Sequence, residues 1–105
     1  MNEIVYTDSL MNYMKSKGIS CILVELVEIS TSDVEIAELH VQFASEKQKK
    51  YFMDKKRYYS KKAPYGELLL PPFALECEDT VTFDLKKVLW FYTVKYDGIK
   101  VSAGF

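Results

Sequence analysis

The sequence predicts an α+β domain that is mainly β, built as a small sandwich or open barrel of about seven strands with two helices. Its 105 residues have the length of one domain, so residues 1–105 are taken as a single unit. Segments rich in β-branched and aromatic residues recur between short polar turns, which is typical of strands. Two segments, residues 8–17 and 45–56, instead carry helix-capping residues.

The N-terminal segment predicts a strand followed by a helix. Residues 3–6 are rich in β-branched and aromatic side chains and form the expected first strand. Thr7 or Asp8 can cap the following helix by accepting hydrogen bonds from backbone N–H groups. Gly18 suits the left-handed conformation that ends a helix, so we expect this helix to span residues 8–17.

Two long strands should follow. Residues 19–29 are apolar and β-branched, residues 30–33 form a polar turn, and residues 34–43 return as the second strand. The apolar positions of this second strand change parity midway, which one extra residue would produce. We therefore expect a β-bulge near Ala37 and Glu38.

The next segment predicts the second helix. Ser45 and Gln48 have the spacing of a capping box, so the helix should begin there and run to about Lys56. Residues 57–62 are expected to be its frayed end or a loop, and Pro64 stops any continuation.

The C-terminal part predicts several short strands. A turn is expected at Glu78–Asp79, and the Asp-Gly pair at residues 97–98 is a strong hairpin signal. The expected strands are residues 66–70, 73–77, 80–85, 88–94 and 99–102.

Composition favours a cytoplasmic protein. No apolar run approaches the roughly 20 residues of a membrane span, and the first residues lack the basic start and apolar core of a signal peptide. Cys21 and Cys77 are therefore expected to be reduced thiols. Cys21 lies within an apolar run, which favours a buried, unreactive side chain.

Few residues are suited to metal binding or catalysis. Cys21, Cys77 and His40 are the weak candidates for a metal site, because the cysteines lie far apart in sequence and His40 is the single histidine. His40 is more simply interpreted as an exposed strand residue beside Glu38 and Gln42. No nucleophile motif and no glycine-rich phosphate loop is present, so we expect neither enzymatic activity nor a cofactor.

Charge is strongly segregated along the chain. Residues 47–62 hold eight basic residues and one acidic residue, whereas the rest holds six lysines and fourteen acidic residues. Cations interleaved with tyrosines could bind nucleic acid. Alternatively, this is a solvated helix whose aromatic face packs on the sheet, or a segment that docks on the acidic part of its own fold or of a second copy. The candidate nucleic-acid residues are Lys49, Lys50, Lys56, Arg57, Tyr58, Lys61 and Lys62.

The two ends of the chain resemble a known family. The resembling segments are residues 4–9, 13–18, 22–28, 81–89 and 94–101. They are similar to the HesB-like group, the fold of the A-type iron–sulfur cluster carriers, and most of all to its short bacterial variants. The resemblance implies a HesB-like fold for this chain.

The carrier function of that family rests on one cysteine after the early strand and a Cys-Gly-Cys motif near the C-terminus. Here residues 30–33 and 102–105 contain no cysteine, so no ligand residue of the family carries over. The resemblance therefore implies a non-catalytic protein without a cluster, acting by protein binding or in an accessory role, with a homodimer as one expected assembly. The alternatives are nucleic-acid binding through residues 47–62 and a metal or iron–sulfur carrier that uses Cys21 and Cys77.

Overall fold

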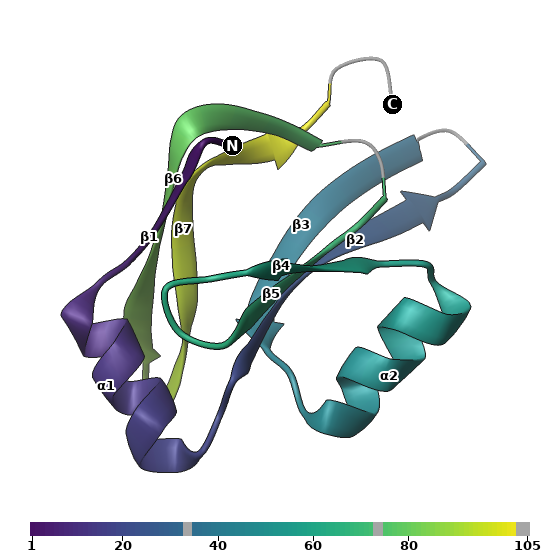
Figure 1. Cartoon of the computed structure of the whole chain (residues 1–105). Coiled ribbons are helices and arrows are strands. Elements are labelled where there is room, and N and C mark those ends of the chain that lie inside the picture. Colours follow the sequence, from purple (N-terminus) through teal and green to yellow (C-terminus); the bar gives the residue numbers. More distant parts are fainter. Residues whose placement is uncertain (33–34, 73–74, 103–105) are drawn as a thin grey trace.

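The computed structural model describes residues 1–32, 35–72 and 75–102, and it confirms an α+β fold that is mainly β (Figure 1). Residues 33–34 and 73–74, which belong to the expected turn and strands, lie outside the described residues, as do residues 103–105. Two open sheets have the strand orders β1-β6-β7 and β3-β2-β5-β4. The elements are β1 (Glu3–Tyr6), α1 (Asp8–Lys17), β2 (Cys21–Ser30), β3 (Glu35–Phe43), α2 (Glu46–Lys55), β4 (Tyr59–Lys62), β5 (Glu67–Leu70), β6 (Leu75–Val88) and β7 (Phe91–Val101).

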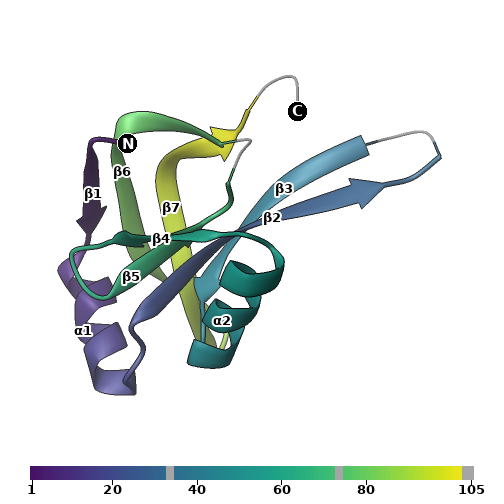
Figure 2. The same cartoon turned by 45° about the vertical axis from the view of Figure 1, so that its right-hand side comes forward.

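The main core lies between the two sheets. β1 pairs in parallel with β6, and β2 pairs in parallel with β5, while the remaining ladders are antiparallel. β3 of the larger sheet lies beside β7 of the smaller sheet (Figure 2). The fully buried members of this core come from both sheets and from α1: Leu10, Met14, Ile22, Val24, Leu68, Leu70, Val81 and Phe83.

A second, smaller core covers the opposite face of the larger sheet. Because side chains alternate along a strand, Cys21 and Leu23 of β2 point away from the main core. They pack with Leu69 of β5 against Phe52 of α2 and Tyr58. The centre of this sheet is therefore buried on both faces, which explains why β2 begins as an unbroken apolar run.

The predicted helix ends are confirmed. The Thr7 hydroxyl accepts a hydrogen bond from the Leu10 N–H at 3.3 Å, so Thr7 rather than Asp8 is the cap. Gly18 ends α1 with φ +68°. At α2, the Gln48 N–H donates to the Ser45 hydroxyl and the Ser45 N–H donates to the Gln48 side chain, which is the predicted capping box.

The predicted bulge near Ala37 and Glu38 is wrong. β2 and β3 pair without interruption from Ile22–Phe43 to Ser30–Glu35. The change of parity arises because Ile36 does not belong to the core: its side chain is 46% exposed at the outer part of the ladder. A register shift occurs instead between β6 and β7, between Cys77 and Thr82.

Residues 57–62 are not a frayed helix end or a loop, because residues 59–62 form strand β4. The helix ends where Arg57 adopts φ +60° and the Tyr58 N–H donates to the Phe52 carbonyl at 3.0 Å. β4 then pairs in antiparallel fashion with the apolar strand β5, so the lysine-rich segment becomes an edge strand of the larger sheet. Lysines on a short edge strand are a common protection against unwanted pairing with other chains.

Three further expectations for the C-terminal part are wrong. Residues 78–79 are no turn, since β6 runs through them, and the expected strand 88–94 is divided by a two-residue turn at Leu89 and Trp90. The Asp-Gly pair at residues 97–98 forms no hairpin. Gly98 (φ +92°) lies within β7 opposite the register shift, where a Cβ atom would lie 2.6 Å from the Thr80 carbonyl oxygen.

Candidate binding surfaces

The two cysteines lie in different parts of the fold. Cys21 is 1% exposed and packs under α2, and burial, with a smaller effect from Glu67, raises the pKa of its thiol to about 11. Cys77 is half-buried on β6, opposite Ile99, and packs against the main core. Because the Cys21 thiol is buried and its pKa is raised, it is a poor nucleophile and a poor metal ligand.

His40 is an exposed residue of β3, as predicted. Its Nε2 atom lies 3.2 Å from Glu38 Oε2, and the neighbouring Gln42 amide donates to Glu25. Its pairing partner Glu25 is four residues from Cys21 along β2, which corresponds to about 13 Å. Within residues 1–32, 35–72 and 75–102, no group of three or more His, Cys, Asp or Glu side chains could hold a metal ion.

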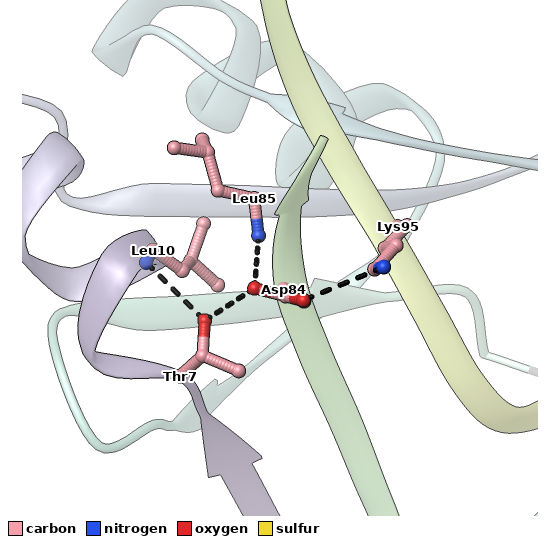
Figure 3. A network of polar contacts seen from close by, with 5 residues as sticks. All are labelled: Thr7, Leu10, Asp84, Leu85 and Lys95. Carbon is pink, nitrogen blue, oxygen red and sulfur yellow. Dashed lines mark hydrogen bonds and ion pairs between the residues drawn. The ribbon is translucent and has the colours of Figure 1, made fainter. Parts of the chain in front are cut away.

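One further polar network links the start of α1 to strands β6 and β7 of the smaller sheet (Figure 3). The Thr7 hydroxyl donates to Asp84 Oδ1 at 2.6 Å, and the same oxygen accepts from the Leu85 N–H at 2.8 Å. Lys95 lies 3.5 Å from the other carboxylate oxygen. The hydrogen bond from Thr7, followed by that from Leu85, lowers the pKa of Asp84. The network ties the start of α1 to β6 and β7, which is a structural role.

Two of the seven candidate nucleic-acid residues are used inside the fold. Lys49 forms an ion pair with Glu67 of β5, and that hydrogen bond raises the pKa of its ammonium group. Tyr58 is only 9% exposed, and its ring packs edge-on against Phe52 with the centroids 5.0 Å apart. Its hydroxyl accepts a hydrogen bond from the Leu26 N–H at 2.9 Å. The interpretation of Tyr58 as a base-stacking residue is therefore wrong.

The other five candidates are exposed, together with two neighbouring lysines. We call this set the basic surface; it lies on α2, the connection after it and β4. Tyr51 and Tyr59 are about half exposed within the same segments. The basic surface consists of Lys47, Lys50, Lys55, Lys56, Arg57, Lys61 and Lys62.

The turn between β6 and β7 exposes large apolar side chains that the sequence did not identify as a site. Leu89 is 74% exposed and Trp90 is 83% exposed. Leu89 also adopts φ +53°, a left-handed conformation that favours glycine or asparagine. We call residues 86–92 the hairpin tip. The one sequence signal for it is the pair of lysines directly before the apolar run, which suits a turn better than a buried strand.

The base of the hairpin tip is held by aromatic contacts. Tyr92 packs on Tyr13 of α1 with the ring centroids 5.0 Å apart, and Tyr13 packs on Phe43 of β3 at 5.4 Å. The Lys87 ammonium group lies 5.9 Å from the centroid of Tyr92. Leu89 and Trp90 therefore project from an anchored base.

The outer parts of β2 and β3 form a two-stranded projection beyond the rest of the fold (Figures 1 and 2). We call residues 26–30 and 36–39 the arm. Ile29 and Ile36 are paired across it and are 44% and 46% exposed. The arm holds two acidic residues, Glu28 and Glu38, and no lysine or arginine, so it is both acidic and apolar.

No helix in the described part of the chain is long and apolar enough to cross a membrane. The chain was compared with family models, curated proteins and solved structures, and none of the three comparisons gives a match.

Proposed function

We propose that this chain is a HesB-like domain without cluster ligands, and that it works by binding a protein partner through the hairpin tip. The observation that carries this proposal is the exposure of Leu89 and Trp90 at the end of an anchored hairpin. Large apolar side chains that are exposed side by side are typical of interaction sites. Tryptophan is also among the residues that contribute most to binding at protein interfaces.

The backbone at Leu89 supports the same proposal. A left-handed residue other than glycine or asparagine costs roughly 1–2 kcal/mol, yet a leucine occupies this position and leaves most of its surface in water. Strain of this kind is concentrated at functional positions. The fold thus bears a stability cost to present an apolar side chain.

The surroundings of the hairpin tip favour one kind of partner. Lys86 and Lys87 are exposed directly before the turn. A matching partner has an apolar pocket for Trp90 and Leu89 with carboxylates at its edge. Because Tyr92 and Tyr13 hold the base of the hairpin, little conformational entropy is lost on binding.

The proposal is tested by placing a photo-crosslinking amino acid at position 90 and, as a control, at the exposed position 100 on β7. We expect one adduct specific to position 90, which is then purified as the partner. Trp90→Ala should weaken its affinity at least tenfold, while Lys100→Ala leaves it unchanged. Equal adducts at both positions, or equal affinity of Trp90→Ala, would contradict the proposal. Binding of the chain to anionic phospholipid vesicles, with no protein adduct at position 90, would also contradict the proposal.

The exposed tyrosines beside the basic surface favour a second proposal, the binding of single-stranded nucleic acid. Tyr51 and Tyr59 are accessible for stacking, and seven exposed cations lie in the same segments. The test is fluorescence anisotropy with a labelled single-stranded oligonucleotide over a salt series. Lys56→Ala/Arg57→Ala should lower both the affinity and the salt dependence. Absence of binding at low salt would remove this proposal.

A further inference from the structure

We infer that a second copy of this chain docks on it, with the acidic arm of each protomer lying against the basic surface on α2 and β4 of the other. The inference goes beyond the proposed function, because none of its contacts involves the hairpin tip. It depends on three properties of the described residues: the composition of the arm, the composition of the outer side of α2, and the face of the sheet on which both lie.

Most of the arm's charged and apolar surface is exposed among the described residues, although the Leu26 N–H is bonded to Tyr58 and Glu38 lies beside His40. Glu28 is exposed, the Glu38 side chain is 52% exposed, and the pair Ile29–Ile36 is nearly half exposed. A two-stranded ribbon alone is marginally stable in water, since it buries little apolar surface. The acidic and apolar side chains of the arm therefore suit a partner that is basic and apolar.

The outer side of α2 carries exposed lysines and an exposed methionine, together with the carboxylates of Glu46 and Asp54. Lys47 and Lys50 are exposed on it, and Met53 is 38% exposed. A shallow hollow of about 250 Å³ lies between Glu46, Lys49, Lys50, Met53 and Asp54. An isoleucine of the arm can enter this hollow beside Met53, while the arm carboxylates meet the exposed Lys47 and Lys50.

The position of the arm makes the contact reciprocal. Ile29 has the same parity on β2 as Cys21 and Leu23, which α2 covers, and Ile36 pairs with Ile29. The apolar pair of the arm therefore lies on the face of the sheet that α2 occupies at the base. Each copy presents an arm and a helix on one side, so a two-fold axis can place each arm on the helix of the other copy. The contact then occurs twice, as in isologous dimers.

The charge distribution favours a second copy over an unrelated acidic ligand. Residues 47–62 carry a net charge of +7 and the remaining residues −8, so the chain supplies its own complement and is almost neutral overall. Within one protomer this charge is only partly matched: Lys49 pairs with Glu67, while the charged residues of the arm and of the basic surface stay exposed. In a dimer the acidic residues of each arm would pair with the basic surface of the other copy.

Sedimentation velocity over a concentration series tests the inference. We expect a dimer whose dissociation constant rises with salt. The arm variant Glu28→Lys/Glu38→Lys and the helix variant Lys47→Glu/Lys50→Glu should each weaken the dimer at least tenfold. An equimolar mixture of the two variants should form a heterodimer. In it the basic arm of the first variant faces the acidic helix of the second, and the unchanged arm of the second faces the unchanged helix of the first. The control Lys86→Glu/Lys87→Glu at the hairpin tip should dimerise like the wild type.

Several results would overturn the inference. These are a monomer at every concentration in low salt, arm variants that dimerise unchanged while their circular dichroism remains native, or no heterodimer in the mixture. Binding of a single-stranded oligonucleotide by a chain that stays monomeric would assign the basic surface to nucleic acid instead. Failure of the proposed function is distinguishable, since Trp90→Ala would then leave partner binding unchanged whatever the oligomeric state.

Discussion

The Tyr58 hydroxyl accepts a hydrogen bond from the Leu26 N–H at 2.9 Å, at the point where β2 extends beyond its neighbour β5. β5 pairs only with residues 21–23 of β2, so Leu26 has no strand partner on that side among the described residues. The phenol takes the place of a strand carbonyl there. A side chain from the basic segment thereby closes part of an open sheet edge.

Tyr58→Phe should therefore destabilise the fold by roughly 1–2 kcal/mol, because the Leu26 N–H loses its acceptor in a partly buried place. Urea unfolding followed by circular dichroism measures the change. The control is Tyr6→Phe: the buried Tyr6 hydroxyl has no hydrogen-bond partner among the described residues, so its removal should be neutral or stabilising. Equal losses in the two variants would show that the hydrogen bond from Leu26 contributes little.

Gly66→Ala should destabilise the fold far more than Gly18→Ala. The two glycines have nearly the same φ, +67° and +68°, so the conformational cost of a side chain is the same. A Cβ atom at Gly66 would overlap the Ser20 carbonyl oxygen, whereas none of the described atoms lies within 4 Å of one at Gly18. Thermal unfolding of both variants gives the comparison, and similar melting temperatures would contradict the close approach of Gly66 to Ser20.

Leu89→Gly should stabilise the isolated chain by roughly 0.5–1 kcal/mol and at the same time weaken partner binding. Glycine relieves the left-handed backbone strain at φ +53° and removes an exposed side chain. Arg57→Gly at φ +60° is the matched variant, with the same expected gain in stability and no effect on binding at the hairpin tip. If Leu89→Gly lowers the melting temperature, the strain argument for the tip is wrong.

Cys21 should resist alkylation while Cys77 reacts. Cys21 is buried with a pKa raised from 9.0 to about 11, and Cys77 is only half-buried. Iodoacetamide labelling followed by mass spectrometry should give one fast-reacting thiol, which is lost in Cys77→Ser. Rapid labelling of Cys21 in the folded protein would contradict its burial under α2.

The same thiol gives a pH dependence of stability. Because the folded pKa of Cys21 lies above 9.0, the unfolded chain binds fewer protons between pH 9 and about 11, and the free energy of unfolding falls as pH rises through that range. The loss should amount to roughly 2–3 kcal/mol. Cys21→Ala should show a smaller fall in urea unfolding at alkaline pH, and an equal fall would assign the effect to other groups.

Thr7→Ala should destabilise the fold by roughly 1 kcal/mol through loss of the helix cap. It should also change how the free energy of unfolding depends on pH in acid. The Thr7 hydroxyl lowers the pKa of Asp84, so this carboxylate stabilises the fold above its usual pKa of 3.8, and the stabilisation is lost as pH falls through the lower folded value. Unfolding measured against pH should therefore show a smaller acid-induced loss in Thr7→Ala. Thr7→Ser keeps the hydroxyl and should behave like the wild type.

Features set by neighbouring residues could be predicted from the sequence. The helix cap at Thr7, the stop at Gly18 and the capping box at Ser45 depend on atoms within a few residues, and all were confirmed. The hairpin predicted at residues 97–98 was wrong, because Gly98 is needed where β7 passes close to the Thr80 carbonyl oxygen, and Thr80 is distant in sequence. A local turn signal cannot reveal which distant strand needs the glycine.

The candidate sites divide in the same way. Exposure of most of the basic segment follows from its composition, but the internal roles of Lys49 and Tyr58 depend on Glu67 and Leu26 in other elements. The hairpin tip was missed because an apolar run predicts burial, and the two lysines before the run do not show where within it the turn falls. Surfaces created by turns are therefore the least predictable part of this chain.

The parallel pairing of β1 with β6 has a consequence for biosynthesis. Glu3 is opposite Thr80 and Tyr6 is opposite Phe83, so the first strand finds its place only after residues 80–83 have left the ribosome. Contacts at such sequence separation slow folding, because a long loop must close before they form. Until then the apolar face of α1 lacks Val81 and Phe83 of β6 as neighbours in the core, and we expect this incomplete core to need a chaperone during synthesis.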